Sequence, residues 1–392
     1  MNRRESIKKI SLGAITPALL SSCHGLSPFS PDENEVNKFE TQWKNWPNME
    51  WIGPEFWGNR LQDWVIENGK AVCRVSEPNR NLQILIAQAN KLIKPYKIKT
   101  QIQILNRNQE NPLLNQVGFM IGAKGRFENY QSSAVFGKGL IAGVNMEGFP
   151  FIGDEIHESK IDLNNPIDLQ LEVVPKEDQF KIRLSISTST TKEIELSFES
   201  KKTYSNEEVT GNLALYSHFE KSEMPSVSFS YFTLEGEKLT IRPSQTFGPI
   251  CFAQYTLHNN ILKLNAQLAP LEKIEGHKAE LQFFRGNWST EQTVTIHPMA
   301  RIAAFRIENF SEETDLKYRI KLTIPLATKT EEYFYEGTIH IAPSNLNNLK
   351  TAVFSCNADH GFPDQEIPEN VLKHKPDLAL FLGDQFYEST GG

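Results

Sequence analysis

A thiol, a carboxylate and a phenol follow two short apolar runs near the end of the printed sequence. Cys356 comes just after the run 351–354, and Asp384 and Tyr387 come just after the run 377–382. Runs that are nearly unbroken in apolar residues are typical of strands buried on both faces of a parallel sheet. Since the carboxyl ends of parallel strands meet at one sheet edge, these side chains could bind one metal ion together.

The segment between the two runs predicts a helix. Residues 365–374 carry apolar side chains at helical spacing, and Pro376 follows as a stop signal. The sequence therefore predicts a strand, helix, strand unit. Asp384 and Tyr387 both follow the second strand, and hard oxygen donors of this kind suit a ferric or other highly charged ion.

These segments resemble the PhoD-like alkaline phosphatases and phosphodiesterases of the metallophosphatase superfamily. The matching residues are Ser-Cys-Asn at 355–357, Pro-Asp-Leu at 376–378 and Gly-Asp-Gln-Phe-Tyr-Glu at 383–388. The resemblance implies that residues 349–392 are the start of an α/β metallophosphatase domain. The family's later motifs, which supply further ligands, are not found in the printed sequence, so we expect an incomplete domain and a chain that is inactive alone.

In that family the cysteine, the aspartate and the tyrosine of these motifs bind iron, and the resemblance carries this role to Cys356, Asp384 and Tyr387. The aspartate is expected to bridge to a second divalent metal, calcium or similar. Asp359 and His360 are further candidate ligands, although they are adjacent where the wider superfamily has an Asp-x-His pair. The implied chemistry is two-metal hydrolysis of a phosphate ester by a water molecule, so no side chain is assigned as the nucleophile.

A purely structural interpretation of the same residues stays open. A Gly-Asp pair after a strand is also an ordinary turn, a cysteine is often a small buried apolar residue, and a tyrosine is often a packed aromatic. A two-stranded parallel unit that exposes Leu380, Phe381 and Leu382 would lack the covering layers that parallel sheets need. We therefore expect that the polypeptide is truncated and that further strands belong to this unit.

The first residues have the pattern of an export signal. An arginine pair at 3–4 and further basic residues precede the apolar run 10–20, which is too short to span a membrane. The run leads into Leu-Ser-Ser-Cys at 20–23, which resembles a bacterial lipobox, and the arginine pair resembles a twin-arginine signal. The resemblance implies a signal peptide over residues 1–22 and a lipid on Cys23.

Composition sets the remaining limits. Residues 23–38 are rich in Ser, Pro, Asn and Glu, which predicts a flexible tether, and we expect a lipid-anchored protein of a bacterial cell envelope, periplasmic or at the cell surface. Cys73, Cys251 and Cys356 do not form a disulfide framework. A net charge of −7 without a basic stripe excludes nucleic acid as a partner. The 370 residues from Cys23 onward (392 minus the 22 of the predicted signal peptide) predict two or three domains, each large enough for its own core.

Residues 39–240 predict an antiparallel sandwich of two sheets. Apolar and polar side chains alternate with a period of two at 98–104, 167–173, 180–186 and 227–231, and turn residues separate these runs. Helices are expected to be nearly absent here.

Tryptophans gather at the start of this sandwich, namely Trp43, Trp46, Trp51, Trp57 and Trp64. The segment 57–69 resembles the entry to a concanavalin-like jelly roll, a fold that often binds glycans. Tryptophans of such a cluster could stack on sugar rings, although in large β-sandwiches they are more often part of the core. A glycan is therefore a possible partner, with no binding residue assigned.

Residues 243–345 repeat the strand pattern on a smaller scale, and their length suits a fibronectin III-like or immunoglobulin-like sandwich. The order of anchor, jelly roll, small sandwich and phosphatase start predicts an exported, lipid-anchored metal-dependent phosphoesterase, present as its N-terminal portion. The alternative is a lipid-anchored carbohydrate-binding or adhesion protein that carries a remnant phosphatase segment.

Overall fold

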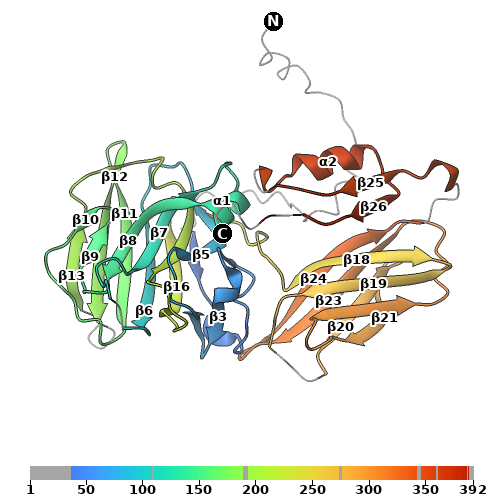
Figure 1. The fold of residues 1–392 in the computed structure, drawn as a ribbon, viewed down its shortest axis with the longest axis horizontal. Coiled ribbons are helices and arrows are strands. Elements are labelled where there is room, and N and C mark those ends of the chain that lie inside the picture. The colour runs from blue at the N-terminus through green and yellow to red at the C-terminus, as the bar shows by residue number, and fades with distance from the viewer. Residues whose placement is uncertain are drawn as a thin grey trace, which may run out of the picture.

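The computed structural model describes residues 37–107, 110–188, 193–272, 276–341, 346–358, 361–385 and 387. The described chain is mainly β, which confirms the predicted fold class at that level. Figure 1 shows a large sandwich, a smaller sandwich beside it and a third, thin unit along the smaller one. The predicted signal peptide, Cys23, Asp359 and His360 lie outside the described residues. None of the helices in the described ranges is both long and apolar enough to cross a membrane.

The large sandwich consists of two sheets whose strands pair antiparallel with their neighbours. The first sheet runs, in spatial order, through β13 (Ile194–Glu199), β12 (Gln179–Thr188), β11 (Ile167–Lys176), β6 (Tyr96–Ile104), β16 (Val227–Gly236), β4 (Lys70–Cys73) and β3 (Trp64–Glu67), with β1 (Lys38–Glu40) beside β16 and β14 (Tyr204–Ser205) beside β12. The second runs through β10 (Glu155–Ile156), β9 (Pro150–Ile152), β8 (Lys138–Asn145), β7 (Gln116–Lys124), β15 (Gly211–His218), β5 (Arg80–Ala89) and β17 (Leu239–Ile241), with β2 (Phe56–Gly58) beside β5.

Sequence alternation decides which side of each strand is buried. Along β6 every second residue, from Tyr96 to Ile104, is buried, and the residues between them are partly exposed. The same alternation continues in the neighbouring strand β11. The apolar side chains of both sheets therefore meet between the layers, where Phe119 and Phe232 stack with ring centroids 6.3 Å apart.

One helix interrupts this β structure. Helix α1 (Tyr130–Phe136) packs on β5, β7 and β15 of the second sheet. The Asn129 side chain caps it, because Asn129 Oδ1 accepts hydrogen bonds from the backbone N–H groups of Gln131 at 2.7 Å and Ser132 at 3.2 Å. Short 3-10 helices are η2 (Trp43–Asn45), η3 (Leu61–Asp63) and η4 (Leu346–Asn348).

The small sandwich has a three-stranded and a four-stranded sheet, both antiparallel. Their strands, in spatial order, are β18 (Ile250–His258), β19 (Ile261–Leu268) and β22 (Ile302–Ile307), and β21 (Trp288–Thr295), β20 (Lys278–Phe284), β23 (Leu316–Pro325) and β24 (Thr330–Ile339). Buried residues alternate along β23 from Leu316 to Ile324. This alternation closes a core between the two sheets.

The hydrophobic core does not stop at the boundary between the sandwiches. A single cluster of buried apolar residues extends through both of them. At the junction the Trp46 ring lies 6.4 Å from the Tyr333 ring, and the backbone N–H of Ala327 donates a hydrogen bond to Asn45 O at 2.7 Å. The two predicted cores are thus joined into one.

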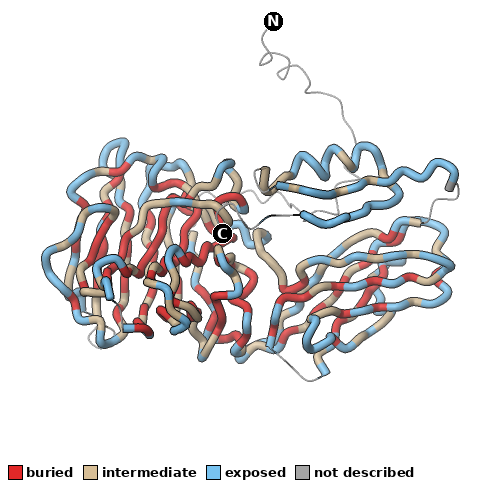
Figure 2. Tube along the Cα trace, viewed as in Figure 1, coloured by how far each residue is buried: buried red, intermediate tan, exposed pale blue. Residues whose placement is uncertain are grey.

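The third unit has the strand, helix, strand order that the sequence predicts. It consists of β25 (Thr351–Phe354), helix α2 (Glu366–Lys373) and β26 (Leu378–Phe381), and the two strands pair in parallel. All four residues of β26 are exposed, and no residue of α2 is buried. Figure 2 shows the contrast with the buried interiors of the two sandwiches.

Candidate functional site

The parallel pairing of β25 and β26 brings together the three residues that the sequence singles out as metal ligands. Cys356 follows β25, whereas Asp384 and Tyr387 follow β26. The Cys356 thiol lies 3.7 Å from Asp384 Oδ2, and the Tyr387 hydroxyl donates a hydrogen bond to the same oxygen at 3.1 Å. A sulfur, a carboxylate and a phenol therefore meet at one point of the sheet edge.

The backbone holds Cys356 and Asp384 in an uncommon conformation. Their φ angles are +54° and +52°, in the left-handed region that few residues other than glycine adopt. The two loops bind each other, since the N–H of Asn357 donates to Asp384 O at 2.7 Å and the Gln385 side chain donates to Phe354 O at 3.2 Å. Conformations of this kind cost energy and are concentrated at functional sites.

The electrostatics of the site centre on Tyr387. Its hydrogen bond with Cys356, and then partial desolvation and the bond with Asp384, raise the pKa of Tyr387 to about 12. At neutral pH the phenol therefore keeps its proton and donates it to the carboxylate. All three side chains are exposed, so an ion from solution can reach them.

The donor set fits a metal ion. Ligand atoms bound at about 2.0–2.3 Å to a common ion lie roughly 3 to 4 Å from each other, and the two distances to Asp384 Oδ2 fall in that range. A thiolate with two oxygen donors suits iron or another transition metal better than calcium. Among the described residues no three or more His, Cys, Asp and Glu side chains gather, so the structure identifies no second ion site in these ranges.

The loop that follows Cys356 contacts the large sandwich. Asn357 donates from its side chain to Asp364 at 2.9 Å, and between them Phe362 packs edge-on against Phe136 of α1, with ring centroids 6.3 Å apart. The site-bearing edge of the third unit is therefore turned toward α1. The sequence gives no signal for this contact, because it joins residues more than two hundred positions apart.

The tryptophan cluster does not form an open sugar platform. Trp43, Trp46, Trp51 and Trp64 are between 0% and 7% exposed and belong to the core. Trp57 is partly exposed, but it packs edge-on against Phe247 with ring centroids 4.9 Å apart. The idea that this cluster stacks as a whole on sugars is thus wrong, and the core interpretation holds.

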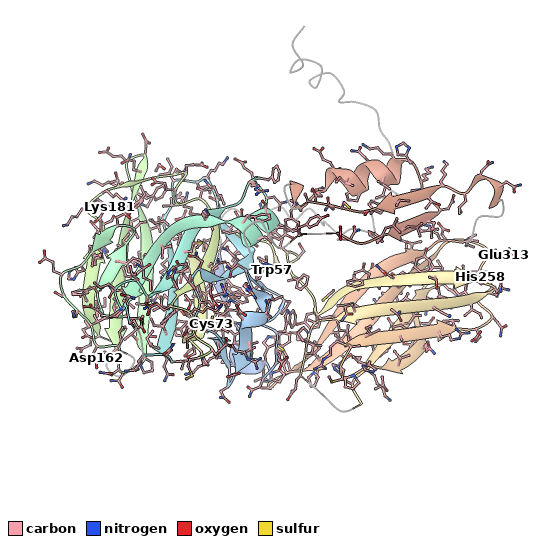
Figure 3. The ribbon with its side chains drawn as sticks, in the orientation of Figure 1. Trp57, Cys73, Asp162, Lys181, His258 and Glu313 are labelled. Atoms are coloured by element: carbon pink, nitrogen blue, oxygen red, sulfur yellow. The ribbon has the colours of Figure 1, made fainter. Side chains whose placement is uncertain are left out.

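Two surface pockets, one on the large sandwich and one where it meets the small sandwich, have no signal in the sequence. One, of about 290 Å³, is lined by residues that include Arg107, Met146, Glu147, Asp162 and Asn164. The other, of about 300 Å³, is lined by Glu50, Trp51, Leu61, Gln62, Arg74 and Pro270. Each combines polar and apolar walls, and their residues come from segments that are distant in the sequence. Figure 3 places Asp162 at the end of the large sandwich that is remote from the small one.

Comparison with known proteins finds similar solved structures at low sequence identity. No family model matches the chain. No curated protein matches it either. Among solved structures, the winged bean acidic lectin complexed with methyl-α-D-galactose is 9% identical over 53% of this chain and 100% of that one, with a TM-score of 0.37. Lectin I from Ulex europaeus, in complex with the methyl glycoside of α-L-fucose, is 8% identical over 52% and 99%, with a TM-score of 0.36.

A third similar structure is the Ca²⁺-bound exoplasmic/lumenal domain of VIP36. It is 9% identical over 51% of this chain and 91% of that one, with a TM-score of 0.33. Similarity at this level assigns neither a family nor a ligand to the chain.

Proposed function

We propose that the third unit carries one half of the metal centre of a PhoD-like phosphoesterase. The single observation that supports this is the convergence of Cys356, Asp384 and Tyr387 on one point after two parallel strands. Loops after the carboxyl ends of parallel strands are where α/β proteins build their sites. The ligand set suits an iron ion, with Asp384 also able to face a second divalent ion such as calcium.

The roles of the chain's own residues follow from their contacts. Asp384 is the common acceptor at the centre, and Cys356 and Tyr387 flank it. Tyr387 holds its proton on the phenol oxygen and donates it to Asp384 Oδ2, so ligation by this oxygen displaces that proton. A bound metal pair would polarise the phosphoryl oxygens of an ester and lower the pKa of a water molecule.

Iron binding tests this proposal directly. We expect the purified chain to take up about one ferric ion with a visible tyrosinate charge-transfer absorption. Tyr387→Phe should abolish the absorption, and Asp384→Asn should abolish stoichiometric binding. Inorganic phosphate added to the iron-loaded chain should shift the absorption, because a phosphate ester would occupy the same position.

A matched variant and an activity assay serve as controls for iron binding at this site. Tyr130→Phe changes a partly exposed tyrosine outside the unit and should keep the full absorption. We expect no hydrolysis of an aryl phosphate ester by this chain, since one half-site does not hold a metal pair. An unchanged absorption in Tyr387→Phe, or measurable turnover by the chain alone, would contradict the half-site.

We further propose that the chain is anchored to a bacterial envelope membrane by a lipid on Cys23. The support is the basic, apolar and lipobox-like order of the first residues. Labelling bacteria that express the protein with a radioactive fatty acid should mark the wild-type protein and leave Cys23→Ser unlabelled. Equal labelling of the two proteins would contradict the attachment of a lipid to Cys23.

A second candidate function is carbohydrate binding by the large sandwich. Its support is the pair of pockets with mixed walls, because saccharides present both hydroxyl groups and apolar C–H faces. We expect the full chain to be retained on an immobilised neutral polysaccharide and to be released by free sugar. Passage without retention over a panel of such polysaccharides would count against it.

A further inference from the structure

The pocket at the junction of the two sandwiches has the anatomy of a small-molecule site. Its volume is about 300 Å³, and binding sites of small molecules begin near this size and favour boundaries between domains. Glu50, Trp51, Leu61, Gln62 and Arg74 come from the large sandwich. Pro270 follows β19 of the small sandwich, so the pocket exists only where the two meet.

Trp51 lies behind this pocket, inside the core, and fixes its shape. It is fully buried, and the Trp46 ring meets it edge-on with centroids 6.0 Å apart. The chain passes between Trp51 and Ala269 at Gly248, where a Cβ atom would lie 3.1 Å from the indole. The φ angle of Gly248 is +73°. Both this backbone conformation and the closeness of the indole therefore favour a glycine at this position.

The buried indole N–H of Trp51 has no hydrogen-bond partner in the part of the chain that the structure describes. The buried indoles of Trp43 and Trp64 share this property without lining the pocket, and all three nitrogens are closed off from solvent, so this N–H does not select the site.

The guanidinium of Arg74 has N–H donors that make no close hydrogen bond with the neighbouring carboxylates. It lies 3.7 Å from Glu50 and 3.6 Å from Glu67, distances too long for hydrogen bonds. The side chain is 41% exposed, and Glu50 beside it is more exposed still. Donors and acceptors in this arrangement can engage neighbouring hydroxyl groups of one ligand at the same time.

The charge around the pocket selects the class of ligand. One cation, Arg74, faces two carboxylates, Glu50 and Glu67, so the rim has no positive excess to hold phosphate or another anion. Gln62 adds a neutral amide, while Leu61 and Pro270 add apolar walls. Neutral molecules with hydroxyl groups on an apolar ring satisfy both kinds of wall.

The other pocket is less suited to the same ligand, because its polar groups already bind one another. Arg107 donates to the backbone oxygens of Leu163 and Asn164 at 3.0 and 2.9 Å. Lys160 pairs with Glu147 at 2.9 Å. A ligand would have to break these contacts before it made its own.

We infer that the junction pocket binds a single ring of a neutral saccharide, with Leu61 and Pro270 beside the ring and Arg74 and Glu50 on its hydroxyl groups. This inference rests on the second candidate function and gives it a location. Binding would also bridge the two sandwiches, since Pro270 belongs to the small one and the other residues to the large one.

Titration with free sugars tests the location. The probes are D-glucose, D-galactose and D-mannose, with inorganic phosphate as the anionic comparison, followed by saturation-transfer NMR and calorimetry on the full chain. Arg74→Gln should weaken the binding of the best sugar at least about tenfold, because it removes charged hydrogen bonds. Glu50→Gln should also weaken sugar binding, because it removes the carboxylate that accepts hydrogen bonds from the sugar hydroxyl groups. It gives an independent test if Arg74→Gln folds poorly.

Arg183→Gln is the matched control. Arg183 also belongs to the large sandwich, is 45% exposed and lies between Glu172 at 3.5 Å and Glu199 at 2.9 Å, but it is outside the pocket. It should bind sugar like the wild type. If sugar binding is unchanged in both pocket variants, the junction pocket is not the site, although the chain still binds carbohydrate. If no sugar binds saturably, both the site and the carbohydrate-binding function are wrong. Tighter binding of phosphate than of sugar would overturn the ligand class.

Discussion

The large sandwich and the third unit differ in what covers their apolar strands. Nine of the ten residues of β5 are buried, because this strand lies inside a sheet that faces a second sheet. Strand β26 consists of apolar residues only, and all four of them are exposed. The more apolar strand is thus the exposed one, so the covering layer and not the composition makes the difference.

This difference has a functional consequence. The residues proposed to bind metal lie on the least covered unit, where packing contributes little to holding their geometry. Their positions depend instead on short backbone bonds between the two loops, such as the bond from Asn357 N to Asp384 O. A bound ion would add the stabilisation that packing does not supply, since metal binding to the folded form stabilises it.

The largest expected effect separates the two regions directly. Phe232→Ala removes a fully buried ring beside Phe56 and Phe119 and should lower the free energy of unfolding by about 3–5 kcal/mol. Phe381→Ala removes a ring that is 60% exposed and should change global unfolding by less than about 1 kcal/mol. Urea denaturation followed by tryptophan fluorescence measures both.

The same pair of variants can show that the two regions do not differ. A loss in Phe381→Ala as large as that in Phe232→Ala would mean that the third unit is covered in solution and unfolds together with the sandwiches. Hydrogen exchange adds a second measure, because amides of β26 should exchange long before those of β5.

A medium effect concerns Lys238, a cation that the large sandwich buries completely. Its ammonium donates to Leu92 O at 2.9 Å and to the Asn206 side chain, and it lies 4.7 Å from the centre of the Phe180 ring. Burial lowers the pKa of Lys238 from 10.5 to about 8. Between these two values the unfolded chain binds more protons than the folded one, so the free energy of unfolding rises with pH.

The expected rise is about 1–2 kcal/mol between pH 8 and pH 9.5 relative to Lys238→Met. Urea titrations of both proteins at several pH values measure it, and the difference between them cancels the contribution of other groups. Below pH 8 the two curves should run parallel. Parallel curves up to pH 9.5 would show that Lys238 is more hydrated than its burial indicates.

The strands of the sandwiches could be predicted because apolar and polar residues alternate along them, and this alternation identifies the buried face. Ile98 and Ile102 are in the core, and the lysines between and beside them are partly exposed, as the alternation in β6 requires. The strand, helix, strand order around Cys356 and Asp384 was equally predictable, since short apolar runs before turn residues are a local signal. The approach of Tyr387 to Asp384 follows from their proximity in the chain.

What the sequence could not predict depends on contacts between distant segments. The contact of Trp46 with Tyr333 depends on the meeting of the two sandwiches, which no local pattern encodes. The junction pocket needs Arg74 and Pro270 to come together, although nearly two hundred residues separate them in the chain. Helix α1 has only seven residues, too few for a recognisable helical spacing of apolar residues, and Asn129 is the one sequence signal for its start.

The smallest expected effect compares the two helices. Asn129→Ala removes the cap of α1 and should lower the free energy of unfolding by about 1 kcal/mol, because two backbone N–H groups lose their acceptor. At the same position in α2, Gln365 makes no capping hydrogen bond and only bonds Glu369 at 2.8 Å, so Gln365→Ala should cost at most about 0.5 kcal/mol.

Urea denaturation with circular dichroism measures both helix variants against the wild type. Since α1 packs on β5, β7 and β15, the loss of its cap should appear in the main cooperative transition. The Gln365→Ala loss belongs to a helix without buried residues and should leave that transition unchanged. Equal shifts in the main transition for the two variants would show that α2 folds together with the sandwiches, and the contrast between covered and uncovered regions would then be wrong.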